Sequence, residues 1–271
     1  GSGEEECTMP LPPSADKIQL LRKVVDENEH IGAGSMEIIH LFNRILAEPQ
    51  TTPEMAALYA AYLKLKEYPQ DSIDVVLERV LEIAPDEVGA RLQLIQSAWG
   101  KRDFDRVIEL SRPAQQYNPD ELAFYYFMAM AYNQQDSIDD ALVTIRRGVT
   151  VANEQTNKEL VSDLYGLMGE MYHEKGMDKE AFAAYDSCLI WNSENIGCLN
   201  NYAYYLSLTG NGLQKAEQMS YKTVKAEPDN GTYLDTYAWI LFMQGRYEEA
   251  KIYIDRKSTR LNSSHTVISY A

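Results

Sequence analysis

Side chains suited to catalysis are few in this sequence, and their spacing matches no catalytic motif. The histidines are His30, His40, His173 and His265, and none forms an HExxH motif or stands at a metal-ligand spacing from a cysteine. His173-Glu174 offers an imidazole and a carboxylate for acid–base work, but the pair is more typical of a solvated helix end. We therefore predict no catalytic residue, no metal site, no cofactor and no enzymatic function.

A glycine-rich turn and two acidic pairs are the other features that could bind small ligands. Gly32-Ala33-Gly34-Ser35 precedes an expected helix, as phosphate-binding turns do, but no strand comes before it and no lysine follows it. A simple helix connection explains this turn better. Asp139-Asp140 and Glu248-Glu249 stand where helices are expected to begin, so we interpret them as groups that favour the helix dipole rather than bind metal.

The net charge of the chain limits the classes of molecule that it is expected to bind. The 271 residues include 41 acidic and 25 basic side chains, which gives a formal charge of −16. Phosphate binding requires clustered Lys and Arg, so this balance argues against nucleic acid and against anionic membranes. No apolar stretch approaches the ~20 residues that cross a bilayer, which argues against membrane insertion. A protein or peptide of basic or apolar character is the expected partner.

The three cysteines do not form a disulfide framework. Cys7, Cys188 and Cys198 contain no CxxC pair and are unevenly placed. Cys188 and Cys198 could meet across a turn between helices, but we interpret them as small buried apolar residues.

The dominant pattern is a repeat of 34 residues that is punctuated by proline. Pro85 and Pro119 are 34 residues apart in matching contexts, and Pro228 stands in a third copy. Each proline follows one amphipathic run and precedes another, where a helix must stop. Between these stops apolar residues recur at intervals of three and four, so each unit predicts two helices joined by a short turn.

Large and small residues alternate at fixed positions within each unit. The clearest set is Tyr165, Met168, Gly169, Tyr172, Gly176, Ala181, Tyr185 and Cys188. This pattern resembles the tetratricopeptide signature, and the same spacing returns around Ala129, Ala203 and Ala238. Small side chains such as Gly169 and Ala181 would let paired helices approach closely. The resemblance implies an all-α fold, a right-handed superhelical solenoid of antiparallel helix pairs.

The domain limits follow from where the repeat holds. We predict a disordered segment over 1–14, a degenerate helix pair over 15–53 and a tandem array of about six units over 54–256. Residues 257–271 break the pattern and look like translated adapter sequence or a disordered end. The resemblance is to proteins of bacterial type, either cytoplasmic or periplasmic and envelope-associated. The first residues carry no readable signal, which leaves the compartment open.

In the tetratricopeptide family the first helices of successive units line a concave groove that receives an extended peptide or a partner helix. The residues expected to be exposed there are Tyr62, Gln96, Tyr126, Met130, Glu170, Asn200, Tyr204, Asp235 and Trp239. We expect Tyr204 and Trp239 to act as aromatic anchors and Asn200 to bond the ligand backbone. Glu170 and Asp235 would favour a basic segment.

Several alternatives remain open at this point. The aromatic rings could instead fill the inner curve by packing on neighbouring helices. The chain could also be the scaffold portion of a larger protein whose effector or catalytic domain is missing, or a module that self-associates. Family members that clamp a carboxylate use Lys, Arg and Asn in this groove, and only Asn200 fits that pattern here.

Overall fold

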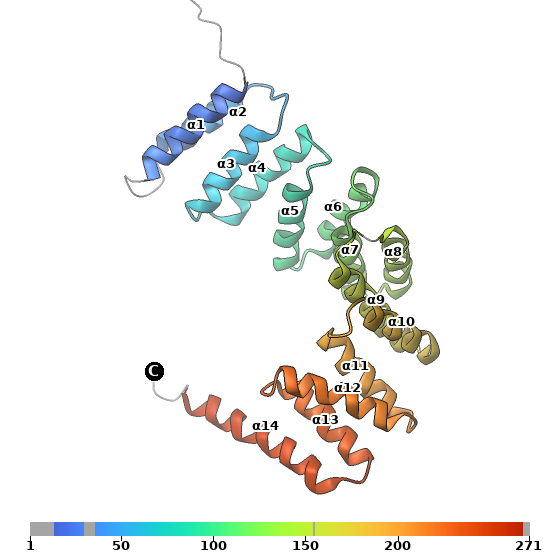
Figure 1. The fold of residues 1–271 in the computed structure, drawn as a ribbon. Coiled ribbons are helices and arrows are strands. Elements are labelled where there is room, and N and C mark those ends of the chain that lie inside the picture. The colour runs from blue at the N-terminus through green and yellow to red at the C-terminus, as the bar shows by residue number, and fades with distance from the viewer. Residues whose placement is uncertain (1–13, 30–35, 154, 268–271) are drawn as a thin grey trace, which may run out of the picture. The chain divides into compact units, whose positions relative to one another are not determined.

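The computed structural model describes residues 14–29, 36–153 and 155–267. Within these ranges the regular structure consists of fourteen α-helices and no strand, which confirms the prediction of an all-helical solenoid of helix pairs (Figure 1). The chain divides into two compact units, 1–119 and 120–271, and each is considered by itself. Residues 1–13 of the expected disordered segment, Cys7, His30 and the turn at 32–35 lie outside the described residues, whereas Ser14, the last residue of that segment, is helical.

Among its described residues, the first unit contains six helices: α1 (Ser14–Glu29), α2 (Met36–Leu46), α3 (Glu54–Leu65), α4 (Gln70–Ile83), α5 (Val88–Gly100) and α6 (Phe104–Tyr117). Its apolar packing includes Phe42, which is fully buried and stacks on Tyr59 with ring centroids 4.7 Å apart. Pro113 lies inside α6, which continues past it to Tyr117.

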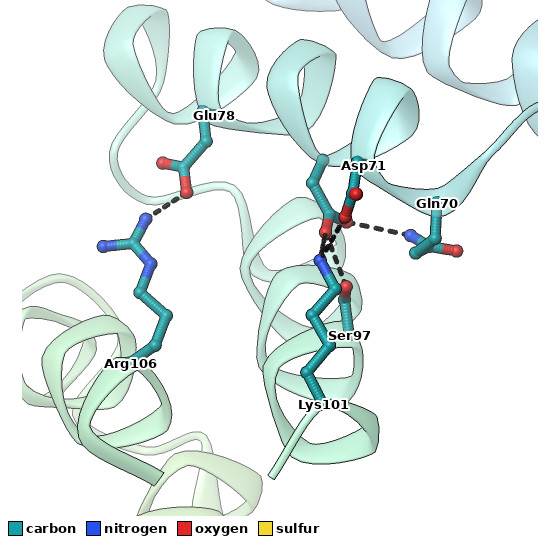
Figure 2. A network of polar contacts seen from close by, with 7 residues as sticks. Gln70, Asp71, Glu78, Ser97, Lys101 and Arg106 are labelled. Atoms are coloured by element: carbon teal, nitrogen blue, oxygen red, sulfur yellow. Dashed lines mark hydrogen bonds and ion pairs between the residues drawn. The ribbon is translucent and has the colours of Figure 1, made fainter. Parts of the chain in front are cut away.

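A polar network links α4, α5 and α6 (Figure 2). The Lys101 ammonium lies 2.7 Å from Asp71 and 2.8 Å from Asp74, and Asp74 also accepts hydrogen bonds from Ser97 and Gln70. Burial by itself would raise the pKa of Asp74, but the hydrogen bonds from Lys101, Ser97 and Gln70 outweigh it and leave that pKa below its usual value.

The part of the second unit that the structure describes contains eight helices: α7 (Leu122–Gln134), α8 (Ile138–Val151), α9 (Lys158–Glu174), α10 (Asp178–Trp191), α11 (Ile196–Leu208), α12 (Leu213–Ala226), α13 (Gly231–Met243) and α14 (Tyr247–Val267). Consecutive helices pack as pairs, α7 on α8 through α13 on α14. The first helix of each pair also contacts the first helix of the next, in the order α7, α9, α11 and α13. This second set of contacts builds a continuous row of first helices.

The small residues lie where the helices of a pair cross, as the signature predicts. A Cβ added at Gly169 on α9 would stand only 2.5 Å from Cε1 of Tyr185 on α10. Ala181 and Tyr185 are both fully buried. The absence of a side chain at position 169 is therefore what admits the tyrosine ring between the two helices. Cys188 and Cys198 are free and buried nearby, in agreement with their interpretation as apolar residues.

A left-handed residue closes the turn inside most pairs. It is a glycine in three of them, Gly176, Gly210 and Gly245, with φ of +70°, +69° and +78°. At the corresponding turn before α8 the residue is Asp136, with φ of +58°. This backbone conformation suits glycine because a Cβ crowds the following carbonyl.

The last helix runs further than the repeat pattern. Helix α14 continues from Tyr247 to Val267, past Arg256, where the array was expected to end. The limits 15–53, 54–256 and 257–271 remain predictions, because helix bounds alone do not define where a repeat array ends.

Candidate partner-binding site

A hollow of about 600 Å³ lies between α11 and α13 in the second unit. Its lining combines two aromatic rings with amide, hydroxyl and carboxylate groups, contributed by Asn200, Asn201, Tyr204, Leu208, Thr232, Asp235, Thr236 and Trp239. Four of these, Asn200, Tyr204, Asp235 and Trp239, are among the residues that the sequence predicted for a groove. The structure therefore brings four of the nine predicted residues together.

Local sequence explains why these side chains share a face. Asn195 and Asn230 cap α11 and α13, and their side chains accept hydrogen bonds from the amides of Cys198 (3.0 Å) and Thr232 (3.1 Å). Because the caps are 35 residues apart, positions along the two helices correspond, and Tyr204 matches Trp239. The contact between α11 and α13 then sets these equivalent positions side by side.

The two aromatic rings are partly exposed, and side-chain contacts hold the Trp239 ring in place. Tyr204 is 39% exposed and Trp239 is 37% exposed. The Trp239 indole N–H donates to Ser207 Oγ at 3.2 Å, and this hydroxyl donates to the Tyr204 carbonyl at 2.6 Å. Trp239 also stacks on Phe242 with ring centroids 6.1 Å apart. An indole ring held in this way can receive an apolar group with little loss of rotamer freedom.

A buried amide forms the polar part of the hollow. Asn200 is only 5% exposed, and its Nδ2 donates to Asn201 Oδ1 at 3.0 Å. Asn201 Nδ2 in turn donates to Glu170 Oε1 on α9 at 2.6 Å. Asn200 Oδ1 is buried and has no hydrogen-bond partner among the described residues. A buried acceptor of this kind costs free energy until a donor reaches it.

The acidic groups are less available than the sequence suggested. Asp235 forms an ion pair with Lys257 on α14. Glu170 is half-buried and is engaged by Asn201. Burial raises the pKa of Glu170, the hydrogen bond from Asn201 lowers it, and the nearby Glu174 carboxylate raises it further, so the net pKa lies above its usual value. Both carboxylates therefore already have a partner within the chain, which reduces their availability to a cationic ligand.

Two of the predicted groove residues are not exposed, which corrects that expectation. Tyr62 is 2% exposed and contacts Phe42 in the core of the first unit, with ring centroids 5.9 Å apart. Asn200 is buried as well, although it borders the hollow. Residues assigned to an outward face by helical periodicity can still be covered by a neighbouring helix, and this is what happens to Tyr62.

The remaining predicted residues lie elsewhere. Tyr126 and Met130 on α7 are half-buried and pack against the apolar core around α7 to α10. Gln96 is exposed on α5 and borders a different hollow, in the first unit, together with Lys64 and Gln93. Tyr126, Met130 and Gln96 therefore stay outside the α11–α13 hollow, and their role in binding remains a prediction.

Sequence reasoning missed several residues of the hollow. Asn201, Leu208, Thr232 and Thr236 line it, and Lys257 reaches Asp235 from α14. The first four were detectable, because 201, 204 and 208 on α11 and 232, 236 and 239 on α13 are spaced by three and four residues and so share a helix face. No sequence signal pointed to Lys257, which stands in the segment that breaks the repeat.

The described residues also bear on other kinds of site. Over residues 14–29, 36–153 and 155–267, no group of three or more His, Cys, Asp or Glu side chains is arranged to hold a metal ion. In the same ranges none of the helices has the length and apolar character needed to span a bilayer.

Known proteins show the same fold. No protein-family model and no curated protein matches this chain. Among solved structures, PilW, a widely conserved type IV pilus biogenesis factor, is similar with a TM-score of 0.63 and 15% identity, over 82% of this chain and 100% of that one. PilF of Pseudomonas aeruginosa is similar with a TM-score of 0.59 and 15% identity, over 73% of this chain and 86% of that one.

A third similar structure is YrrB, a tetratricopeptide-repeat protein with an unusual peptide-binding site, with a TM-score of 0.52 and 12% identity, over 67% of this chain and 90% of that one. Together with the small-residue crossings, these likenesses define the chain as a helical solenoid of the tetratricopeptide type. At such low identity they establish the fold and leave the function to be argued from the site.

Proposed function

We propose that this protein is an interaction scaffold that holds an extended peptide segment of a partner protein in the α11–α13 hollow. One observation carries the proposal: Asn200, whose buried Oδ1 no described residue satisfies, lines a hollow that also presents two partly exposed aromatic rings. Arrays of this fold commonly bind partners along the row of first helices. YrrB, which has this fold, is described as having a peptide-binding site.

An extended segment fits the hollow better than a partner helix does. The amides within a helix already donate to carbonyls of the same helix, whereas an extended segment has backbone N–H groups free to donate. Asn200 Oδ1 needs one such donor. The Tyr204 and Trp239 rings would receive an apolar side chain of the same segment, since aromatic residues of this kind often dominate binding energy.

The charge of the hollow favours an apolar segment over a strongly basic one. Asp235 is already paired with Lys257, so a cationic ligand would have to displace the Lys257 ammonium from Asp235. Such an exchange between partly exposed ion pairs yields little free energy.

The proposal is tested by selecting peptides from a displayed random library on the full chain. Peptides that the wild type selects should bind the Tyr204→Ala/Trp239→Ala double variant at least ten-fold more weakly, with unchanged helix content by circular dichroism. The matched control is Tyr221→Ala, because Tyr221 is also exposed but lies on α12 and does not line the hollow. Equal binding by the double variant, or no selected peptide at all, would refute the proposal.

Self-association is a second candidate function that one surface supports. Phe242, Met243 and Tyr247 are exposed together at the turn between α13 and α14, and the Phe242 and Tyr247 ring centroids are 5.1 Å apart. Exposed apolar groups that adjoin one another often mark an interface. Sedimentation over a concentration series would show a mass that rises with concentration for the wild type and stays monomeric for Phe242→Ser/Tyr247→Ser. A single monomeric mass at every wild-type concentration would exclude this candidate.

A further inference from the structure

We propose that Glu170 sets the direction of a hydrogen-bond relay through Asn201, and so makes the hollow select a ligand that donates a hydrogen bond to Asn200. This inference rests on the proposed function and specifies the chemistry of its ligand. It also gives a role to Glu170, which does not line the hollow. Glu170 would act as a positioning residue from α9, which contacts α11.

The direction of the relay follows from what each group can donate. An ionised carboxylate only accepts hydrogen bonds, so Asn201 must turn its Nδ2 toward Glu170. Asn201 Oδ1 then faces Asn200, which must present its own Nδ2 there. The remaining atom, Asn200 Oδ1, is left as an acceptor that no described residue satisfies. A single carboxylate therefore fixes the orientation of two amide groups that could otherwise be flipped.

The relay has a consequence for ligand choice. In this orientation Oδ1 is the unsatisfied atom of a residue that lines the hollow, so a ligand N–H that reaches it gains a partner, while a carboxylate or phosphate oxygen meets another acceptor. A buried mismatch of two acceptors leaves both groups unpaired, which is the basis of strong discrimination in polar sites. The hollow should thus accept an extended peptide backbone and reject an acidic terminus.

Protonation of Glu170 would reverse the relay. A neutral Glu170 can donate to Asn201 Oδ1, which turns both amides and presents Asn200 Nδ2 in place of the acceptor. The pKa of Glu170 is raised by burial, so this reversal occurs at a higher pH than for an ordinary glutamate. The titratable groups that interact electrostatically with Glu170 are Glu174 on α9 itself and, from neighbouring helices, Tyr126, Tyr185, Cys198 and Tyr205.

The first arm of the test needs no ligand. In the wild type labelled with 15N at asparagine, the side-chain amide signals of Asn200 and Asn201 should move together between pH 4 and pH 8, with one shared midpoint. Glu170→Gln should abolish this movement, and Glu159→Gln, which changes an exposed carboxylate on the same helix, should leave it intact. Signals that do not respond to pH in the wild type, or that still respond in Glu170→Gln, would overturn the relay.

The second arm measures ligand choice with a peptide selected at pH 7 from the random library. Replacing each backbone amide of that peptide in turn by an ester removes one N–H and leaves the shape nearly unchanged. One ester should weaken binding to the wild type about three- to ten-fold. The same ester should cost less than two-fold in Glu170→Gln, because the new amide at position 170 can either donate or accept and lets Asn200 turn. A penalty that is equal in both proteins would overturn the proposed selectivity.

The two experiments distinguish a failure of the proposed binding function from a failure of the hydrogen-bond relay. If no peptide binds, the proposed function and the ligand choice both fail, while the titration still decides whether the relay exists. If peptides bind but no ester matters, the binding function stands and this inference falls.

Discussion

Two glycines on the same helix should respond in opposite ways to the same substitution. An added Cβ at Gly169 would lie 2.5, 2.7 and 2.8 Å from three ring atoms of Tyr185, whereas at Gly166 its nearest neighbour is Cys188 Sγ at 3.6 Å. Non-bonded carbons prefer about 3.5–4.0 Å, so alanine at 169 must push the ring by up to ~1 Å. Tyr185 is fully buried, and a close-packed core offers its ring little space into which it can move.

The magnitudes follow from two opposing terms. Glycine to alanine inside a helix contributes about 1 kcal/mol of stability. Overpacking a filled core costs about 1–3 kcal/mol, so Gly169→Ala should be destabilising by up to about 2 kcal/mol. Gly166→Ala meets only an ordinary contact and should be stabilising by up to about 1 kcal/mol.

Thermal unfolding followed by far-ultraviolet circular dichroism measures the difference. For a chain of this size about 1 kcal/mol corresponds to roughly 2–4 °C in Tm, so the two variants should differ by several degrees on opposite sides of the wild type. Since both substitutions add the same methyl group to α9, helix propensity cancels in the comparison. If Gly169→Ala is as stable as Gly166→Ala, the claim that a missing side chain admits Tyr185 between α9 and α10 is wrong.

Three further predictions concern stability. Tyr185→Phe should raise Tm, because the buried Tyr185 hydroxyl has no hydrogen-bond partner among the described residues. Tyr202→Phe should lower Tm, because the Tyr202 hydroxyl donates to Asp186 at 3.0 Å. Equal Tm shifts of the two variants in the same direction would contradict this prediction. Asp136→Gly should raise the free energy of unfolding, measured with urea, by up to about 1 kcal/mol, because φ at this position is +58°. A lower free energy of unfolding for this variant would refute the prediction. Asp74→Asn should lower Tm at pH 7. The pKa of Asp74 is depressed in the folded state, so its stabilising contribution is fully present above the unfolded value of about 4 and is lost as pH falls through the folded pKa. A Tm difference between the wild type and Asp74→Asn that does not shrink as pH is lowered below that unfolded value would argue against it.

The sequence by itself determined the repeat and its internal packing. Helical periodicity and the placement of Gly169, Ala181 and the prolines are local properties, because a helix face and a close crossing need only particular residue types at particular intervals. The same reasoning located Tyr204 and Trp239, since equivalent positions of successive repeats recur on one surface. These features do not depend on which neighbour covers which side chain.

Only the tertiary structure decided exposure and hydrogen-bond direction. Tyr62 and Tyr204 were predicted on the same grounds, yet Phe42 on α2 packs against Tyr62, which is buried, while Tyr204 remains partly open. Likewise, α14 brings Lys257 to Asp235, and α9 brings Glu170 to Asn201. Each of these contacts joins residues about twenty or more positions apart, and their geometry depends on how whole helices pack, which spacing along the chain does not encode.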